Sequence, residues 1–179
     1  AMSGDRLQTE RLILRRLAPR DADGYIAFCR SRRARFAGGP RSAAAAWREF
    51  AGELGHWDLR GYGMFAVTER GGDDTCLGLV GPWYPADWPE REVGWLIWAG
   101  AEGKGYAAEA ARACLAHVFG RLGWETAVSY IDEGNTRSIA LAERLGASRD
   151  DAAPTPSACA DTLVFRHARA AWTGEAADA

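Results

Sequence analysis

Residues 102–109 read Glu102-Gly103-Lys104-Gly105-Tyr106-Ala107-Ala108-Glu109 and lie between a predicted strand and a predicted helix. Glycine lets the backbone turn tightly and approach a ligand closely. The free amides in the first turn of a helix, together with the helix dipole, favour a phosphate group. The segment therefore predicts a phosphate-binding loop. An ordinary glycine turn that leads into a helix is the alternative, because glycine-rich loops are weak motifs by themselves.

Two other kinds of phosphate loop can be compared with this segment. A Walker loop requires Ser or Thr directly after its lysine, but Lys104 is followed by Gly105, so this motif is excluded. The dinucleotide pattern G-x-G-x-x-A fits Gly103, Gly105 and Ala108, and Asp132 stands where a ribose-binding acid would lie. That fold places its loop after the first strand of a mostly parallel sheet, whereas several strands precede the loop here. A nicotinamide-dependent dehydrogenase is therefore the weaker enzyme alternative.

Hydrophobic periodicity places the other elements around the loop. Short apolar runs bounded by turn residues predict strands at 12–16, 64–67, 75–83, 91–98, 126–131, 147–149 and 162–167. Apolar residues at helical spacing predict helices at 19–30, 43–59 after the cap Ser42, 106–122 and 136–145. The basic cluster of Arg30, Arg32, Arg33 and Arg35 is interpreted as a solvated helix end.

The order of these elements predicts the fold class. Strands joined directly by turns before the loop indicate an antiparallel sheet, and the strand, helix, strand, helix order that follows indicates a parallel crossover. We therefore expect a mixed α/β fold with a central, mostly antiparallel sheet, one parallel strand pair and flanking helices.

Length and composition indicate one domain. The chain has 179 residues, of which 47% are hydrophobic and 26% charged, as in an ordinary globular protein. We assign the domain to residues 7–168, with a disordered or cloning-derived start at 1–6 and a C-terminal tail at 169–179. No apolar run reaches the roughly 18 residues of a spanning helix, and the start lacks a secretory pattern. A cytoplasmic protein with no membrane partner is expected.

Charge and cysteine content exclude other classes of partner. The 22 basic and 24 acidic residues give a net charge of −2, so no global field attracts nucleic acid. The four cysteines are far apart: Cys29, Cys76, Cys114 and Cys159. They form no Cys-x-x-Cys pair and the three histidines have no ligand spacing, so we expect reduced cysteines and no metal.

Three segments in this order resemble a known family. The strand, glycine loop and helix are followed by Asn135-Thr136-Arg137-Ser138-Ile139-Ala140-Leu141-Ala142-Glu143-Arg144-Leu145-Gly146, as in the GCN5-related N-acetyltransferases. The opening Leu7-Gln8-Thr9-Glu10-Arg11-Leu12-Ile13-Leu14-Arg15 is similar to the branch of ribosomal-protein-alanine N-acetyltransferases. The resemblance covers nearly all of residues 7–167. It implies acetyl-CoA as cosubstrate and direct transfer of the acetyl group to a primary amine in a ternary complex.

The resemblance also implies the coenzyme site. The family motif of Gln or Arg, two residues, Gly, one residue, then Gly or Ala falls on Glu102, Gly105 and Ala107, and Glu102 departs from it. The pyrophosphate contacts come from backbone amides, so the departure leaves binding intact. These amides belong to Gly103, Lys104, Gly105, Tyr106, Ala107 and Ala108. Splayed strands that end near Trp98 and Ile131 would admit the pantetheine arm, with Ile97 and Trp98 at its border.

The chemistry of amine acetylation calls for a base. The nucleophile must be neutral, yet an alkyl ammonium has a pKa near 10.4 and a peptide terminus a pKa of about 7.7–8.0. Glu92 lies in the strand before the loop, where the family often carries a glutamate that deprotonates the amine directly or through water. An exposed acid at a strand end is the alternative interpretation.

The leaving thiolate also needs stabilisation. Many family members use a tyrosine seven positions after the motif's asparagine, but that position is Ala142 here. In the branch that this chain resembles, the serine three after the asparagine contacts the sulfur, which implies Ser138. A common residue in the first turn of a helix is the alternative for Ser138, and Asn135 either caps that helix or holds the coenzyme.

The acceptor is left open by the sequence. Trp83, Tyr84 and Trp88 flank a proline-rich loop beside Glu92 and are candidates for an acceptor wall, with simple packing as the alternative. The expected partner is a small-molecule or peptide amine, and a homodimer stays open. An acyl-CoA-binding regulator without catalysis is the alternative from another functional class.

Overall fold

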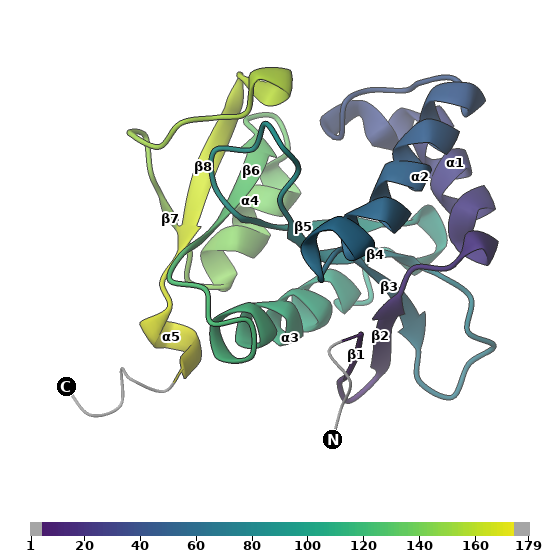
Figure 1. Cartoon of the computed structure of the whole chain (residues 1–179), viewed down its shortest axis with the longest axis horizontal. Helices are drawn as coiled ribbons and strands as arrows, with labels where there is room; N and C mark the ends of the chain where they lie inside the picture. The colour runs from purple at the N-terminus through teal and green to yellow at the C-terminus, as the bar shows by residue number, and fades with distance from the viewer. Residues whose placement is uncertain (1–4, 174–179) are drawn as a thin grey trace.

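The computed structural model describes residues 5–173 and contains one large sheet. Its strands are β1 (Arg6–Gln8), β2 (Leu12–Arg16), β3 (Phe65–Glu69), β4 (Gly78–Trp83), β5 (Glu92–Ile97), β6 (Ala127–Asp132), β7 (Ser148–Arg149) and β8 (Thr162–His167). Within these residues the eight strands follow the order β1-β2-β3-β4-β5-β6-β8-β7. Its helices are α1 (Ala22–Arg30), α2 (Ala43–Arg60), α3 (Tyr106–Gly120), α4 (Thr136–Arg144) and α5 (Ala170–Thr173) (Figure 1).

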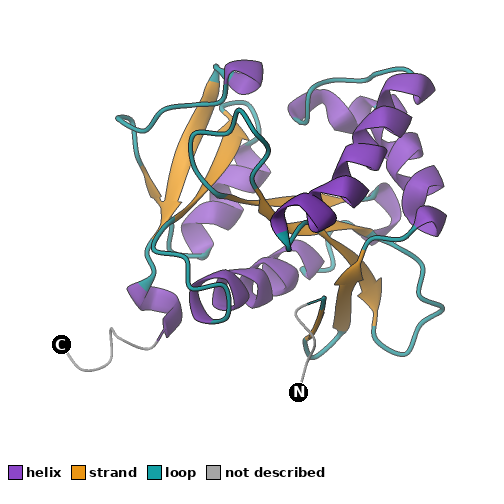
Figure 2. Ribbon diagram, viewed as in Figure 1, coloured by secondary structure: helices purple, strands orange, loops and turns teal. Residues whose placement is uncertain are grey.

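The sheet is mostly antiparallel, and this confirms the predicted fold class. Among the described strands, only β5 and β6 pair in parallel, and their register consists of one pair, Glu92 with Val128. β5 pairs with β4 along six residues and β6 pairs with β8 along six. The two parts of the sheet therefore diverge from one point, as Figure 2 shows. A doubly wound parallel sheet for a dinucleotide is absent from residues 5–173.

Next to the pair Glu92 and Val128, the buried side chain of Ser129 joins β6 to β5 by a hydrogen bond. Ser129 Oγ donates to the carbonyl of Val93 at 2.6 Å and lies 2.9 Å from His167 Nε2. Since the hydroxyl hydrogen is used on Val93, His167 Nε2–H must be the donor to Ser129. Burial lowers the pKa of His167 to about 4, so the ring is neutral in this contact. The side chain of Ser129 thus replaces a backbone hydrogen bond where β5 and β6 begin to separate.

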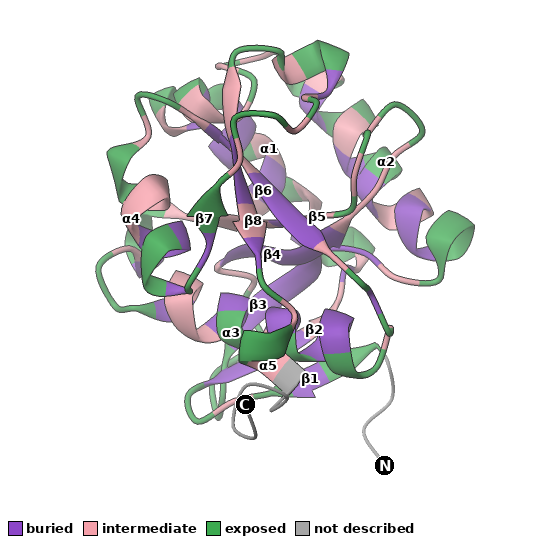
Figure 3. Cartoon of the chain, turned by 90° about the vertical axis from the view of Figure 1, so that its left-hand side faces the viewer, coloured by how far each residue is buried: buried purple, intermediate pink, exposed green. Residues whose placement is uncertain are grey.

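Helices cover both faces of the sheet. One core holds Phe65, Val67 and Val80 together with apolar residues of α3, such as Leu115. The alternate strand residues, such as Leu79, turn to the other face and pack with α1 and α2. Figure 3 shows buried residues along the central strands and exposed residues on the outer turns of the helices. The period-two pattern of β3 and β4 therefore supplies two cores.

Most of the predicted elements are confirmed within a few residues. Ser42 Oγ accepts from the amide of Ala45 at 3.2 Å and begins α2, and Gly61 ends it with a φ of 76°. β4 begins at Gly78 rather than 75, although Leu77 N still donates to Val67 O at 2.8 Å. The helix expected up to residue 122 ends at Gly120.

Regular structure extends into both predicted chain ends. Arg6, in the start predicted to be disordered or cloning-derived, belongs to β1 and is therefore ordered; β1 pairs antiparallel with β2. A three-residue strand is too short for a periodic signal. The expected tail contains α5, so residues 170–173 are helical. Residues 1–4 and 174–179, which fall in the same two assignments, lie outside the described residues.

Candidate active site

The glycine loop leads into α3, and the first backbone amides of this helix are left without helical hydrogen bonds. Gly103 and Gly105 have φ values of 75° and 79°, in the left-handed region that favours glycine. Gly105 is the N-cap of α3, and the first hydrogen bond of the helix runs from Glu109 N to Gly105 O at 3.1 Å. The amides of Tyr106, Ala107 and Ala108 precede this bond and have no partner within the helix. They provide the donors that a pyrophosphate requires.

The segment before β2 holds this loop in place. Glu109 Oε1 accepts from Thr9 Oγ1 at 2.6 Å and from Arg11 N at 2.9 Å, and Glu109 Oε2 accepts from Arg11 Nε at 2.7 Å. Arg11 Nη1 also donates to the carbonyl of Lys104 at 2.9 Å. Burial opposes ionisation of Glu109, but the hydrogen bonds from Thr9 and Arg11 prevail and lower its pKa. Sequence reasoning missed this contact, although an acid in the first turn of a helix is a signal for it.

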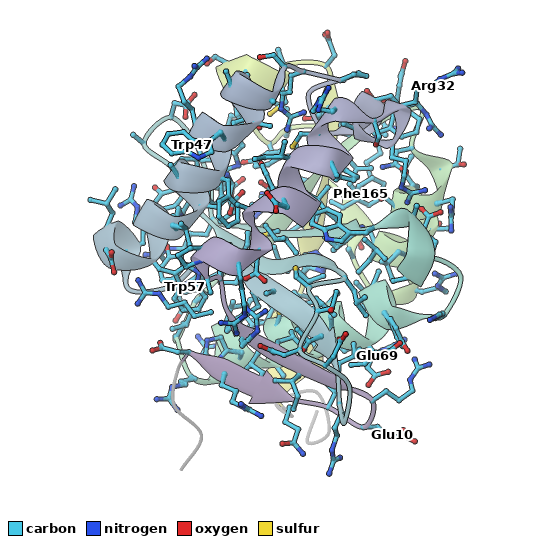
Figure 4. All side chains as sticks on the ribbon, turned by 90° about the vertical axis from the view of Figure 1, so that its right-hand side faces the viewer. Glu10, Arg32, Trp47, Trp57, Glu69 and Phe165 are labelled. Carbon is cyan, nitrogen blue, oxygen red and sulfur yellow. The ribbon has the colours of Figure 1, made fainter. Side chains whose placement is uncertain are left out.

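The side chains of Lys104 and Tyr106 turn to Glu69. Tyr106 Oη donates to Glu69 Oε1 at 2.7 Å, and Lys104 Nζ lies 3.5 Å from the same oxygen. Glu10 and Glu69 lie at the same corner of the molecule in Figure 4. A groove of about 530 Å³ there is lined by Glu10, Arg11, Glu69, Arg70, Gly71 and Tyr106. The side chains of Lys104 and Tyr106 thus contact Glu69, and of these two residues Tyr106 has its amide in the first turn of α3.

Glu102 lies between two arginines at the start of the loop. Arg33 forms an ion pair with Glu102, and Arg137 Nη1 lies 3.2 Å from Glu102 Oε1. The hydrogen bond from Arg33 lowers the pKa of Glu102 below its usual value. Arg33 is half-buried and also donates to Ile97 O at 3.1 Å, so its assignment to a solvated helix end was wrong. The acid at this position of the motif brings two guanidinium groups to the loop.

β5 and β6 separate beyond the pair Glu92 and Val128, and we call the space between the diverging strands the opening. Backbone groups of β5 are directed toward it. Trp98 N donates to Leu77 O at 2.8 Å on the β4 side. Because backbone groups alternate in direction along an antiparallel strand, those of Val93, Trp95 and Ile97 face β6. Ser129 bonds the carbonyl of Val93 and Arg33 that of Ile97. The amide and carbonyl of Trp95 lie between these two, where a pantetheine amide would pair.

The side chain of Trp98 lies away from this opening. Its ring contacts Phe28 and Tyr25 of α1, with centroid distances of 4.8 Å and 6.4 Å. Trp98 belongs to the apolar cluster between the sheet and helices α1 and α2. Of the predicted pair at the border of the coenzyme arm, Ile97 therefore presents its carbonyl toward β6, while Trp98 fills the core.

Ser138 lies across the opening from the middle of β5. Its Oγ accepts a hydrogen bond from Trp95 Nε1 at 3.2 Å, and its amide donates to Asn135 Oδ1 at 3.3 Å. Asn135 is therefore the N-cap of α4, whereas the hydroxyl of Ser138 is directed toward β5. Since the indole is the donor in this contact, the hydrogen of the Ser138 hydroxyl is left for another acceptor.

Glu92 occupies the single point where β5 and β6 pair. Its Oε2 accepts from Trp88 Nε1 at 2.7 Å, and the side chain is partly buried. Burial raises the pKa of Glu92 to about 7, against the hydrogen bonds from the Trp88 indole and the Tyr130 backbone. Glu92 is thus not an exposed acid at a strand end. A carboxyl with a pKa near neutrality is suited to accept and release a proton.

The three aromatic residues of the predicted acceptor wall have different surroundings. Trp83 stacks on His56 with ring centroids 4.4 Å apart. Tyr84 donates its amide to His56 Nε2 at 2.9 Å, and its ring lies 4.7 Å from the guanidinium of Arg60. Among residues 5–173, Trp88 is the one of the three that donates a hydrogen bond to Glu92. Trp83 and Tyr84 pack the base of the loop that carries Trp88 toward Glu92.

A second buried acid, Glu53 of α2, lies near Glu92 and was missed by the sequence interpretation. The residue is 8% exposed, and its Oε2 has no hydrogen-bond partner among the described residues. The charge of Glu92 contributes to raising the pKa of Glu53, after burial itself. Glu53 stands on the same face of the helix as Ala46, Phe50 and Trp57, and an acid on this apolar face was the available signal.

Residues 5–173 also bear on three further features: a second groove, metal ligands and membrane-spanning helices. A groove of about 620 Å³ is lined by Glu133, Ile139, Glu143, Ala147, Ser148, Arg149, Leu163 and Phe165, none of them a predicted site residue. Within the described part of the chain, no three His, Cys, Asp or Glu side chains gather as metal ligands would. No helix in that part is long and apolar enough to cross a membrane.

Comparison with known proteins identifies the family of this chain. The acetyltransferase (GNAT) domain matches residues 11–148. An acetyltransferase from Agrobacterium tumefaciens strain C58 has 38% identity and a TM-score of 0.84, over 93% of this chain and 96% of that chain. A candidate ribosomal-protein-serine acetyltransferase from Vibrio cholerae has 25% identity and a TM-score of 0.71, over 93% of this chain and 99% of that one.

A curated relative matches a shorter part of the chain. YkkB of Bacillus subtilis (strain 168), described as an uncharacterized protein, is 35% identical over 99 residues, which are 51% of this chain and 56% of YkkB. The chain thus spans little more than half the length of that relative. The family match is wider and includes the glycine loop, Glu92 and Ser138. This chain belongs to the GNAT family of acetyltransferases, whose cosubstrate is acetyl-CoA.

Proposed function

We propose that the protein is an N-acetyltransferase that moves an acetyl group from acetyl-CoA to a primary amine by direct attack in a ternary complex. The observation that carries the proposal is Glu92, a partly buried carboxyl with a pKa of about 7 at the point where β5 and β6 diverge. A carboxyl of this pKa is a suitable base for an amine. The acceptor in this proposal is a protein N-terminus or a small-molecule amine.

The residues around the opening fit the coenzyme. The amides of residues 103–108 would take the pyrophosphate, and Arg33 and Arg137 lie beside them with positive charge. Trp95 would pair its backbone amide and carbonyl with the pantetheine arm. Asn135 would hold the start of α4 beside the thioester through its cap. Acetyl-CoA, when bound there, supplies an activated acetyl group on sulfur.

Glu92 and Ser138 have separate roles in the transfer step. Glu92 accepts the proton that the amine nitrogen loses as the new C–N bond forms and the C–S bond breaks. The electron pair of the broken bond stays on sulfur as a thiolate. Ser138 donates its hydroxyl hydrogen to this sulfur, since its oxygen already accepts from Trp95. A hydrogen bond that strengthens as charge develops lowers the barrier of the step.

The test is release of free thiol from acetyl-CoA in the presence of an amine library. We expect turnover with at least one primary amine and none with tertiary amines of similar size, which cannot form the amide. Tight acetyl-CoA binding without any thiol release would contradict the proposal and favour an acyl-CoA-binding regulator. The same screen narrows the acceptor class.

Several sequence-based expectations stay predictions beside this function. They are a single domain at residues 7–168, a cytoplasmic location, and no nucleic-acid, membrane or metal partner. Whether the chain forms a homodimer is likewise left open by the sequence. Sedimentation analysis of the purified chain would decide the oligomeric state.

A further inference from the structure

Glu53 is a buried carboxyl that forms no ion pair within residues 5–173. It projects from the middle of α2, is 8% exposed and has one oxygen, Oε2, without a hydrogen-bond partner among the described residues. An ionised carboxylate in such a position is costly unless it is paired. The catalytic proposal above gives Glu53 no role. Without a ligand the carboxyl avoids this cost by keeping its proton, and a bound cation would stabilise the ionised form instead.

The charged neighbours of Glu53 on the helical side are already paired or neutral. Arg41 makes contacts of 2.6–2.7 Å with Glu49, one turn before Glu53 on α2. From α1, Tyr25 donates to Glu49 at 3.4 Å, and burial raises the pKa of Cys29, which keeps the thiol neutral. The cation at this end of α2 is thus engaged by Glu49.

The strand side adds a second acid and a second unpartnered group. Glu92 of β5 acts electrostatically on Glu53, and no cation is among the groups that shift the pKa of either. Tyr130 of β6 has a buried hydroxyl without a hydrogen-bond partner in residues 5–173. Its ring lies 6.4 Å from that of Trp88, which itself bonds Glu92. Glu53 Oε2 and Tyr130 Oη are therefore two buried polar atoms without a hydrogen-bond partner in residues 5–173, and the charge of Glu92 acts on both groups.

Glu92 and Glu53 suit two different protonation states of an amine. Glu92 serves a nitrogen that must become neutral to attack the thioester, so it cannot also keep a permanent ion pair with that nitrogen. Glu53 matches a group that stays charged throughout the reaction. Resting on the proposed acetyltransferase function, we propose that Glu53 binds a second ammonium group of the acceptor, and that the acceptor is a small diamine.

The protonation state of Glu53 supports this role. Burial, with the charges of Glu92 and Glu49, raises the pKa of Glu53 to about 8, so Glu53 holds a proton at pH 7 before a diamine binds. An ammonium group displaces this proton because it favours the carboxylate. Binding of a diamine at pH 7 is therefore expected to release a proton that originates from Glu53.

The experiment compares 1,4-diaminobutane with 4-amino-1-butanol, which carries a neutral hydroxyl in place of the second amine. For the wild-type protein we expect kcat/KM for the diamine to exceed that for the amino alcohol at least about tenfold, which corresponds to roughly 1.4 kcal/mol. Glu53→Gln should bring the ratio near one. Asp58→Asn is the matched control, since Asp58 is an exposed acid of the same helix that pairs with Arg16; it should keep the ratio.

Folding of the variant is not expected to obscure the result. Because the folded state keeps the Glu53 proton up to a pKa of about 8, whereas the ordinary value is 4.5, Glu53 lowers stability as the pH rises through this window. Glu53→Gln should therefore unfold at an equal or higher temperature at pH 8. Equal wild-type rates with the two acceptors, or a ratio that persists in Glu53→Gln, would overturn the diamine proposal.

A binding measurement separates this proposal from the catalytic one. Calorimetry of 1,4-diaminobutane at pH 7, in two buffers of different ionisation enthalpy, reports affinity and proton release without any turnover. Loss of both in Glu53→Gln but not in Asp58→Asn supports the diamine site even if no amine is acetylated, in which case only the acetyltransferase proposal fails. No binding to the wild-type protein overturns the diamine site.

Discussion

Trp88 Nε1 donates a 2.7 Å hydrogen bond to Glu92 Oε2 across the turn that leads into β5. The indole thus holds the carboxyl at the point where β5 and β6 diverge, with its Oε2 already committed to one donor. Burial raises the pKa of Glu92 to about 7, and the hydrogen bond from Trp88 works in the opposite direction. The pair therefore determines both the position of the candidate base and the pH at which it is active.

Replacement of the base should lower turnover. Glu92→Gln keeps the size of the side chain and an oxygen for Trp88 but removes proton acceptance, so kcat at neutral pH should fall by about 10² or more. Wild-type activity should rise as the pH increases through about 7, where Glu92 loses its proton. The variant should lack this step and recover in part at high pH, where the free amine is neutral. A wild-type pH-rate profile in Glu92→Gln would return Glu92 to a structural role.

Removal of the indole donor should move the pH profile rather than abolish activity. Trp88→Phe leaves the charged form of Glu92 with one hydrogen bond fewer, so the pKa of Glu92 should rise above about 7. The acid limb of the kcat profile should then shift to higher pH. Trp83→Phe is the control, because Trp83 stacks on His56. A shift of equal size in both variants would contradict the specific role of Trp88.

The hydroxyl of Ser138 should matter more for turnover than for coenzyme affinity. Ser138→Ala removes the donor to the departing sulfur, whose charge exists only as the C–S bond breaks. We expect kcat to fall by about tenfold or more while the Kd for acetyl-CoA changes less. The cap of α4 comes from Asn135, so thermal stability should be nearly unchanged. Lower stability with normal turnover would assign Ser138 to the helix alone.

The coenzyme loop should depend on the absence of a side chain at Gly105. Gly105→Val places a branched group at a φ of 79° beside the amides of α3, so acetyl-CoA affinity should drop severely. The same backbone strain, of order 1–3 kcal/mol, is reproduced by Gly61→Val at a φ of 76° after α2. Calorimetry of folded samples of both variants makes the comparison. Equal affinities would remove the loop from the coenzyme site.

The contact between Glu109 and the segment before β2 should stabilise the protein in a pH-dependent way. Hydrogen bonds from Thr9 and Arg11 lower the pKa of Glu109, so the folded state releases the proton at a lower pH than the unfolded chain. This stabilisation is present above the unfolded pKa and is lost as the pH falls through the folded pKa. Glu109→Gln should lower unfolding stability at pH 7 by about 1–2 kcal/mol, and by less at pH 3.

Glu125 provides a matched control for Glu109, because it also belongs to an ion pair at the surface. Glu125 pairs with Arg169, and its side chain is largely exposed. Surface pairs of this kind contribute about 0–1 kcal/mol, so Glu125→Gln should leave the unfolding temperature nearly unchanged. Chemical denaturation at both pH values measures the difference. An equal effect of the two substitutions would mean that Glu109 does not hold the loop.

The sequence by itself predicted the elements that depend on local structure. Period-two and period-3.6 patterns identified the strands and the long helices, because a side chain's face follows from its spacing along one element. The glycines at 103 and 105 and the caps Ser42 and Asn135 are local as well, since a φ or an N-cap involves only a few neighbouring residues. The family resemblance then supplied the roles proposed for Glu92 and Ser138.

Only the tertiary structure decided which distant side chains meet. Glu109 contacts Thr9 and Arg11 from about 100 residues away along the chain, and Arg33 turns from an apparently solvated cluster to Glu102. Such contacts leave no period in the sequence, because they depend on how the sheet diverges and how the helices cover it. The same holds for Glu53 and Glu92, two acids on different elements. Their approach, and the burial that raises both pKa values, arises when α2 packs on the sheet beside β5.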